Sequence, residues 1–276
     1  MSKKFTAIIA LVLMFSHAVG QPFSLKSTGG EKPFRLDIYY GTEGKGAFVQ
    51  YRGQQGIIPL AMKARTSEEK TAPSKATYVW DEIIGGKITG SYGLTQDMGK
   101  LSKAWYKRAK DGKLFHLEQI HEPIGNRRVH KYLVHGVLIS FRTTASDNLL
   151  SLLYPDGSRQ TSLLPDFDHP DPQRQGTIAD YNFDGYDDLA FSVPEAGMGV
   201  YRTFSIYLYN PTSKRFQILA EPDAPQAKCS GLCDVKLDQK NKLLISSCRG
   251  GATWWKDIYS FSHNNNLIWI RSSKQQ

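Results

Sequence analysis

The chain has 276 residues and a formal net charge of +9, with 35 lysines and arginines against 26 aspartates and glutamates. The basic residues are scattered along the sequence, so they indicate an ordinary solvated surface or a broadly cationic one. An exported protein rarely meets nucleic acid, so with the export signal described next we predict no nucleic-acid partner for this positive charge. The charge favours an anionic envelope polymer or an acidic protein surface.

The N-terminus has the pattern of a secretory signal peptide. Lys3 and Lys4 precede an apolar run over residues 5–15, and the small residues Ala18 and Gly20 stand where a signal peptidase reads. The run is too short to span a bilayer, and no cysteine lies near the cleavage point, so we predict neither a membrane anchor nor a lipoprotein. We expect residues 1–20 to be removed and residues 21–276 to act in the periplasm or as a secreted protein.

Strand patterns dominate residues 21–122, which we predict to form an N-terminal β-rich lobe. Apolar residues on both sides of a Gly-Thr-Glu-Gly-Lys turn predict a hairpin over residues 35–51. A second hairpin is predicted over residues 78–92, because Gly85-Gly86 suits a type I′ turn. Residues 98–108 carry apolar side chains at spacings that fit a helix and, almost as well, a strand.

A polar stretch that contains Pro123 and Gly125 predicts a linker over residues 123–131. Beyond it, residues 132–276 show a further series of short strand patterns separated by turns, so we predict a second, C-terminal β-rich lobe. The strands of this lobe are expected at residues 132–143, 149–154, 189–193, 201–209, 215–219, 233–238, 243–248, 258–261 and 267–271.

The segment Asp-Tyr-Asn-Phe-Asp-Gly-Tyr-Asp-Asp at residues 180–188 has the spacing of a calcium loop. Gly185 stands at position 6, where such a loop bends, and hard oxygen donors without His or Cys favour calcium over a transition metal. The twelfth position is Phe191 and not the Glu of an EF-hand, and a strand pattern follows, so the loop is not an EF-hand. The alternative is an Asx-rich turn between two strands. The predicted ligands are Asp180, Asn182, Asp184, the Tyr186 carbonyl and Asp188.

Three cysteines lie in the last fifth of the chain, and export permits a disulfide there. If residues 233–238 and 243–248 form a hairpin with its turn at residues 240–241, Cys233 stands directly opposite Cys248. We therefore predict a Cys233–Cys248 bridge. A bridge from Cys229 to Cys248 is the second possibility, and one cysteine stays unpaired in either case.

The sequence lacks the familiar catalytic signatures. No Gly-x-Ser-x-Gly elbow, His-Glu-x-x-His motif or phosphate-binding glycine loop occurs in it. A carboxylate pair for glycoside hydrolysis would have to combine Asp81 or Glu82 with Glu195, and the sequence gives no distance between them. We therefore predict a protein that is not an enzyme.

Several segments of the second half resemble a group of exported bacterial proteins with one calcium loop in a propeller-like or sandwich-like β domain. The resemblance is carried by the calcium loop, by residues 207–216, by Arg249-Gly-Gly-Ala252 and by the closing residues 267–271. It covers about residues 132–271. The group includes immunity proteins that inhibit lysozyme-like effectors of bacterium-killing type IV secretion systems. Those proteins are lipoproteins, whereas this chain lacks the lipobox cysteine, and residues 33–120 have no counterpart in them.

The resemblance implies that the C-terminal lobe of this mainly β, two-lobed fold is propeller-like or sandwich-like, with calcium as the cofactor. It also implies a periplasmic inhibitor or immunity protein whose partner is a lysozyme-like or other envelope-targeting enzyme. Tyr181 and Tyr186 flank the predicted ligands and are candidate anchors for that partner; the alternative is that both pack beneath the loop. Two other functions stay open, an envelope module that binds glycan or peptidoglycan, and an unrecognised hydrolase.

Overall fold

The computed structural model describes residues 22–29, 32–68, 75–97, 100–120, 129–145, 147–167, 173–196 and 199–274. The predicted signal peptide and residues 123–128 of the predicted linker lie outside this part of the chain. In the described residues the regular structure is β-strand, apart from one short 3₁₀-helix, η1 (Thr42–Gly44). The prediction of a mainly β protein is therefore confirmed.

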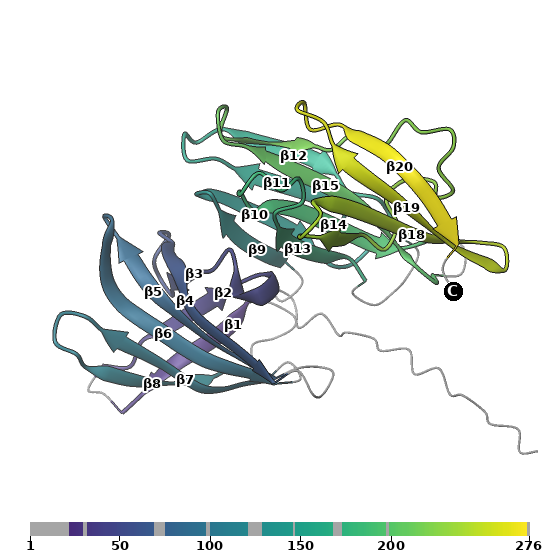
Figure 1. Cartoon of the computed structure of the whole chain (residues 1–276). Helices are drawn as coiled ribbons and strands as arrows, with labels where there is room; N and C mark the ends of the chain where they lie inside the picture. Colours follow the sequence, from purple (N-terminus) through teal and green to yellow (C-terminus); the bar gives the residue numbers. More distant parts are fainter. Residues whose placement is uncertain are drawn as a thin grey trace, which may run out of the picture.

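The first half of the chain is a closed antiparallel β-barrel (Figure 1). Successive strands pair with each other, and the barrel closes where the first strand pairs with the eighth, with Leu25 opposite Gln119. The strands are β1 (Phe23–Thr28), β2 (Arg35–Tyr39), β3 (Phe48–Tyr51), β4 (Ile58–Glu68), β5 (Lys75–Ile84), β6 (Lys87–Asp97), β7 (Lys100–Arg108) and β8 (Leu114–Gln119).

Side-chain alternation explains why these segments form a barrel. In β5 every second residue is buried, and the inward set includes Tyr78, Trp80 and Glu82. Aromatic rings fill much of the interior, and the fully buried Trp80 donates its indole N–H to the Gly44 carbonyl at 2.8 Å. Because a closed barrel has no free edge, its strands need no partner from another chain.

Both hairpins predicted for the first half are confirmed. β2 pairs with β3, and β5 pairs with β6 through Gly85 and Gly86, which both have positive φ as a type I′ turn requires. Residues 100–108 form the strand β7 and not a helix. The reason is long-range, because β7 must bond both β6 and β8 for the barrel to close.

The second half consists of three four-stranded antiparallel sheets, each formed from consecutive strands. The first sheet contains β9 (Val129–Val134), β10 (Val137–Arg142), β11 (Leu149–Leu153) and β12 (Arg159–Leu163). The second contains β13 (Gln175–Ala179), β14 (Asp188–Pro194), β15 (Arg202–Asn210) and β16 (Arg215–Ile218). The third contains β17 (Lys236–Asp238), β18 (Leu243–Gly250), β19 (Thr253–Phe261) and β20 (Leu267–Lys274).

The middle sheet is buried on both faces. Leu189 and Phe191 of β14 share a core with the first sheet, whereas Ala190 of the same strand shares a core with the third. This explains the nearly continuous apolar run of β14, in which residues 188–193 are all buried. The three sheets therefore pack face to face in chain order.

The start of the second half differs from its prediction in two respects. Residues 129–131, predicted as the end of a linker, belong to β9. Residues 132–143, predicted as one strand, form part of the β9–β10 hairpin, which turns at His135 and Gly136. Both turn residues have positive φ, so the pair forms the kind of tight turn that Gly85-Gly86 forms in the barrel.

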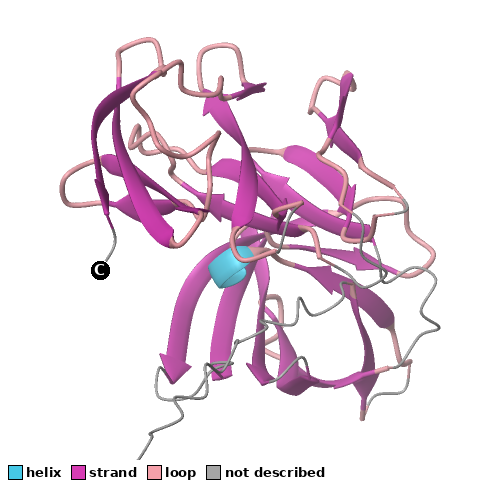
Figure 2. Cartoon of the chain, turned by 90° about the vertical axis from the view of Figure 1, so that its right-hand side faces the viewer, coloured by secondary structure: helices cyan, strands magenta, loops and turns pink. Residues whose placement is uncertain are grey.

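The barrel and the sheets meet at the loop around η1 (Figure 2). The Leu133 amide of β9 donates to the Gly46 carbonyl at 2.9 Å. A Cβ at Gly46 would lie 2.8 Å from the Ile178 side chain of β13, so only glycine permits this approach. The adjacent Lys45 pairs with Asp187 at 2.5 Å. The barrel is thus joined to the sheets beside the predicted calcium loop.

Candidate functional site

The predicted calcium loop connects β13 to β14 and folds its side-chain oxygens inward. Both oxygens of Asp180 accept backbone amides, from Asp184 at 3.0 Å and from Gly185 at 2.9 Å. Asp184 in turn accepts the Tyr186 amide at 2.9 Å and the Asn182 side-chain amide at 2.9 Å. Gly185 has φ +92°, the left-handed conformation that glycine allows at the bend.

Asp188 lies beneath the loop and is fully buried. Its two oxygens accept the backbone amides of Tyr181 and Tyr209, each at 2.8 Å. Burial raises the pKa of Asp188 to about 7, and the negative charges of Asp184 and Asp180 act in the same direction. The carboxyl groups of Asp180, Asp184 and Asp188 therefore lie close enough in this short loop to influence one another.

The donor set fits calcium by its chemistry. Carboxylate oxygens of Asp180 and Asp184, the amide oxygen of Asn182 and a backbone carbonyl are hard ligands of the kind calcium takes. No described lysine or arginine forms an ion pair with Asp180, Asp184 or Asp188, whereas the neighbouring Asp187 is paired with Lys45. Within the described residues, however, no group of three His, Cys, Asp or Glu side chains is arranged to hold a metal. A cation here would depend on the amide and carbonyl oxygens as well.

The two tyrosines of the loop have different environments. Tyr181 is 5% exposed, packs in the core between the second and third sheets, and bonds Thr177 through its hydroxyl at 2.7 Å. The Tyr181 side chain is therefore not accessible to a partner, and the prediction that it anchors one is wrong. Tyr186 is 42% exposed, and its ring lies 6.0 Å from the Tyr209 ring, which stacks on His135 at 4.0 Å.

The disulfide joins Cys229 to Cys248, so the predicted Cys233–Cys248 bridge is wrong and the second possibility is the one observed. β17 and β18 do have the expected register, with Lys236 opposite Ile245. The strand does not extend back to Cys233, because Asp234 has a positive φ of 36° and redirects the chain. The backbone of Cys233 instead forms an isolated antiparallel β-bridge with Thr203 of the second sheet. Its thiol is buried and forms no disulfide.

Asp257 of β19 positions the disulfide. This fully buried carboxylate accepts the backbone amides of Lys228 at 2.9 Å and Cys229 at 2.7 Å, and also the Ser272 hydroxyl. These bonds hold the chain before Cys229 against the third sheet, where Cys248 of β18 can reach it. No local pattern indicates this role, because Asp257 lies 28 residues from Cys229.

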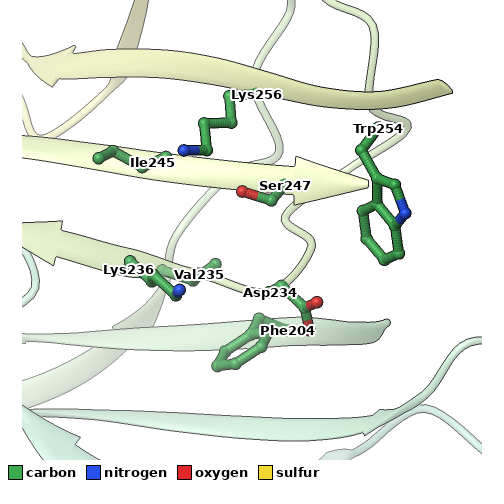
Figure 3. A pocket seen from close by; sticks show the side chains of 8 residues that line it. All are labelled: Phe204, Asp234, Val235, Lys236, Ile245, Ser247, Trp254 and Lys256. Carbon is green, nitrogen blue, oxygen red and sulfur yellow. The ribbon is translucent and has the colours of Figure 1, made fainter. Parts of the chain in front are cut away.

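A recess of about 490 Å³ opens between β15 and the third sheet. Figure 3 shows the side chains that line it, which come from β15, the β17 region, β18 and β19. The aromatic residues are Phe204 and Trp254, and the cationic ones are Lys236 and Lys256. Asp234, Val235, Ile245 and Ser247 complete the lining. Sequence reasoning missed this recess, since it depends on how β15 meets a different sheet.

The carboxylates considered for hydrolysis do not come together. Glu82 is buried inside the barrel, where it accepts hydroxyl groups of Thr89, Tyr92 and Tyr106. Asp81 points to the other face of the same strand, where Lys63 and Ser91 bond it. Glu195 lies after β14 in the second half and accepts the Gly199 amide.

No protein-family model and no curated protein matches this chain. Among solved structures, a protein from Lactobacillus plantarum matches with 14% identity and a TM-score of 0.28, covering 91% of this chain and 82% of that one. A putative 6-phosphogluconolactonase from Bacteroides uniformis matches with 10% identity and a TM-score of 0.21, covering 92% of this chain and 99% of that one. A mannose phosphorylase from Leishmania mexicana has 11% identity and a TM-score of 0.16, covering 92% and 84%. Similarity this low carries no argument about function.

Two further findings concern location. A disulfide indicates an oxidising compartment. The described part of the chain contains no helix with the length and hydrophobicity that crossing a membrane requires.

Proposed function

We propose that this chain is an exported calcium-binding protein that acts by binding and not by catalysis. Its partner would be a peptidoglycan-cleaving enzyme of the envelope, which it inhibits in the periplasm. The observation that carries the proposal is the recess on the third sheet, which combines aromatic side chains with two lysines.

The composition of the recess favours an acidic protein partner. Lys236 and Lys256 come from different strands, so a carboxylate placed between them would be attracted by both. Trp254 and Phe204 supply the aromatic surface that dominates binding energy in many interfaces. An enzyme that cleaves glycosidic bonds carries acidic residues in its cleft, which makes it a suitable partner for this surface.

The framework around the recess is rigid, and this also supports binding. The disulfide and Asp257 fix one side of the third sheet. The calcium loop contacts the other end of the same sheet, because Asn182 donates to the Asn265 side chain at 3.2 Å. A preorganised surface loses less conformational entropy when a partner binds, so the metal and the disulfide would strengthen binding without touching the partner.

The test is inhibition of a purified lysozyme-like muramidase, measured as the rate of peptidoglycan clearing. We expect inhibition by the wild-type chain, about tenfold or more weaker inhibition for Trp254→Ala and for the double variant Lys236→Ala/Lys256→Ala, and no change for Lys240→Ala on the exposed β17–β18 turn. Failure of the wild-type chain to inhibit such enzymes would contradict the proposal.

Two other outcomes would assign the alternatives. Binding of soluble glycan fragments to the recess without any effect on a muramidase would make the chain an envelope binding module. Cleavage of peptidoglycan by the purified chain alone, lost when one carboxylate outside the calcium loop is replaced, would make it a hydrolase.

A further inference from the structure

The barrel has a recess at the end that faces away from the sheets. The junction with the sheets lies at η1, between β2 and β3, whereas this recess lies near the β1–β2 and β7–β8 turns at the opposite end of the strands. Its volume is about 460 Å³. The aromatic side chains that line it are Phe34, Tyr51, Tyr106 and Phe115, and its cations are Lys32, Arg108 and Lys113.

A buried carboxylate lies directly behind two of these aromatic residues. Glu82 is 3% exposed and accepts the Tyr106 hydroxyl at 3.2 Å, the Tyr92 hydroxyl at 3.0 Å and the Thr89 hydroxyl at 2.7 Å. Tyr92 also bonds the Tyr51 hydroxyl at 2.7 Å. Tyr51 and Tyr106, which line the recess, are therefore both connected to Glu82.

This network fixes the direction of the hydroxyl protons. A tyrosine has one proton to donate, and that of Tyr92 goes to Glu82, so Tyr51 must donate its own proton to Tyr92. Tyr106 likewise donates to Glu82. Burial raises the pKa of Tyr51 and of Tyr106, so both stay protonated. Each of these two hydroxyl groups thus has lone pairs left to accept a hydrogen bond and no proton left to donate one.

The rim of the recess carries positively charged side chains, which donate hydrogen bonds. The Lys113 ammonium lies 5.2 Å from the centre of the Phe115 ring, and the Arg108 guanidinium lies 5.5 Å from it. Arg108 is already paired with Asp111, but Lys113 and Lys32 form no described ion pair. The Phe34 ring meets Phe115 edge to face at 5.4 Å, which leaves an apolar surface between the cations and the tyrosines.

We propose that the open end of the barrel binds an acidic sugar. Such a ligand has a carboxylate for Lys32 and Lys113, ring hydroxyl groups that donate to Tyr51 and Tyr106, and a C–H face for Phe34 and Phe115. Each of its three parts has a counterpart in the recess. The site lies in the barrel, so it does not depend on the muramidase partner proposed for the third sheet.

The experiment is a calorimetric titration of the full chain with glucuronic acid, compared with glucose. We expect saturable binding of glucuronic acid and at least tenfold weaker binding of glucose, because only the acid engages the lysines. Lys113→Ala should weaken glucuronic acid binding about tenfold or more without changing glucose binding. Lys110→Ala, an exposed lysine on the same turn that does not line the recess, should leave both unchanged.

Tyr51→Phe tests the network separately, because it removes the acceptor but keeps the ring. We expect both sugars to bind more weakly to this variant. Equal binding of glucuronic acid and glucose, no binding of glucuronic acid, or unchanged binding of glucuronic acid in Lys113→Ala would overturn the proposal. Lys113 is exposed, so its replacement preserves the fold and the result can be interpreted even if the Tyr51 variant is unstable.

Discussion

Calcium should stabilise this chain by an amount that the loop chemistry allows us to estimate. The ligand set lacks a bidentate Glu at position twelve, which places the dissociation constant in the weak extracellular range of about 10⁻⁴–10⁻³ M. At about 10 mM calcium, an ion that binds only the folded state then adds about 1.4–2.7 kcal/mol to the free energy of unfolding. For a chain of this size that corresponds to a rise in Tm of about 3–10 °C.

The effect of the metal can be separated from the effect of the loop's own hydrogen bonds. Asp180→Ala removes the acceptors of two backbone amides, so it should destabilise the protein by about 1–2 kcal/mol even with chelator present. Asp180→Asn removes the negative charge but keeps a side-chain oxygen, and it should mainly reduce the calcium-dependent shift. Asp187→Asn is the matched control, because Asp187 is paired with Lys45 and is not a predicted ligand.

The assay is thermal unfolding followed by circular dichroism, with EGTA, calcium, or magnesium at the same ionic strength. An equal Tm in EGTA and calcium for the wild-type chain would refute the calcium site. If calcium raised the Tm of Asp180→Asn as much as that of the wild-type chain, the assignment of Asp180 as a ligand would be refuted.

Three further predictions follow from groups outside the loop. Burial lowers the pKa of His130 to about 4 from its usual 6.5, so the folded state binds a proton less readily than the unfolded state. The free energy of unfolding should therefore fall by up to about 3 kcal/mol as the pH drops from 6.5 to 4. Urea titrations of wild type and His130→Gln at both pH values measure this, and an equal pH dependence in the two would contradict it. Gly93→Ala should cost about 1–3 kcal/mol in the same titration, because the new Cβ would lie 2.4 Å from the Trp105 ring; an unchanged midpoint would show that Trp105 moves aside freely. One thiol per chain should react with a maleimide, only after unfolding, and peptide mapping should place it at Cys233; labelling of Cys229 would contradict the disulfide.

Local patterns predicted much of the fold. The type I′ hairpin at Gly85-Gly86 and most strands of the second half depend on alternation and turn residues, which are visible in a single sequence. His135-Gly136 offered a similar turn signal, but the apolar run through residues 132–143 obscured it. The closure of the barrel was not predictable, because Leu25 and Gln119 are brought together only when all eight strands are in place.

The disulfide shows where such reasoning fails. The register that puts Cys233 opposite Cys248 is present in β17 and β18, so the local geometry was correct. The backbone reversal at Asp234 and the pairing of Cys233 with Thr203 come from a neighbouring sheet. Both recesses were missed for the same reason, since their side chains converge from strands that are distant in sequence.

The most direct test of the proposed function is a titration of a lysozyme-like muramidase with the calcium-loaded chain, with residual peptidoglycan clearing as the readout. We predict inhibition that saturates at one chain per enzyme, that weakens about tenfold or more in Lys236→Ala/Lys256→Ala, and that is retained in Lys240→Ala. Full enzyme activity at saturating chain, or inhibition that is the same in both variants, would contradict it.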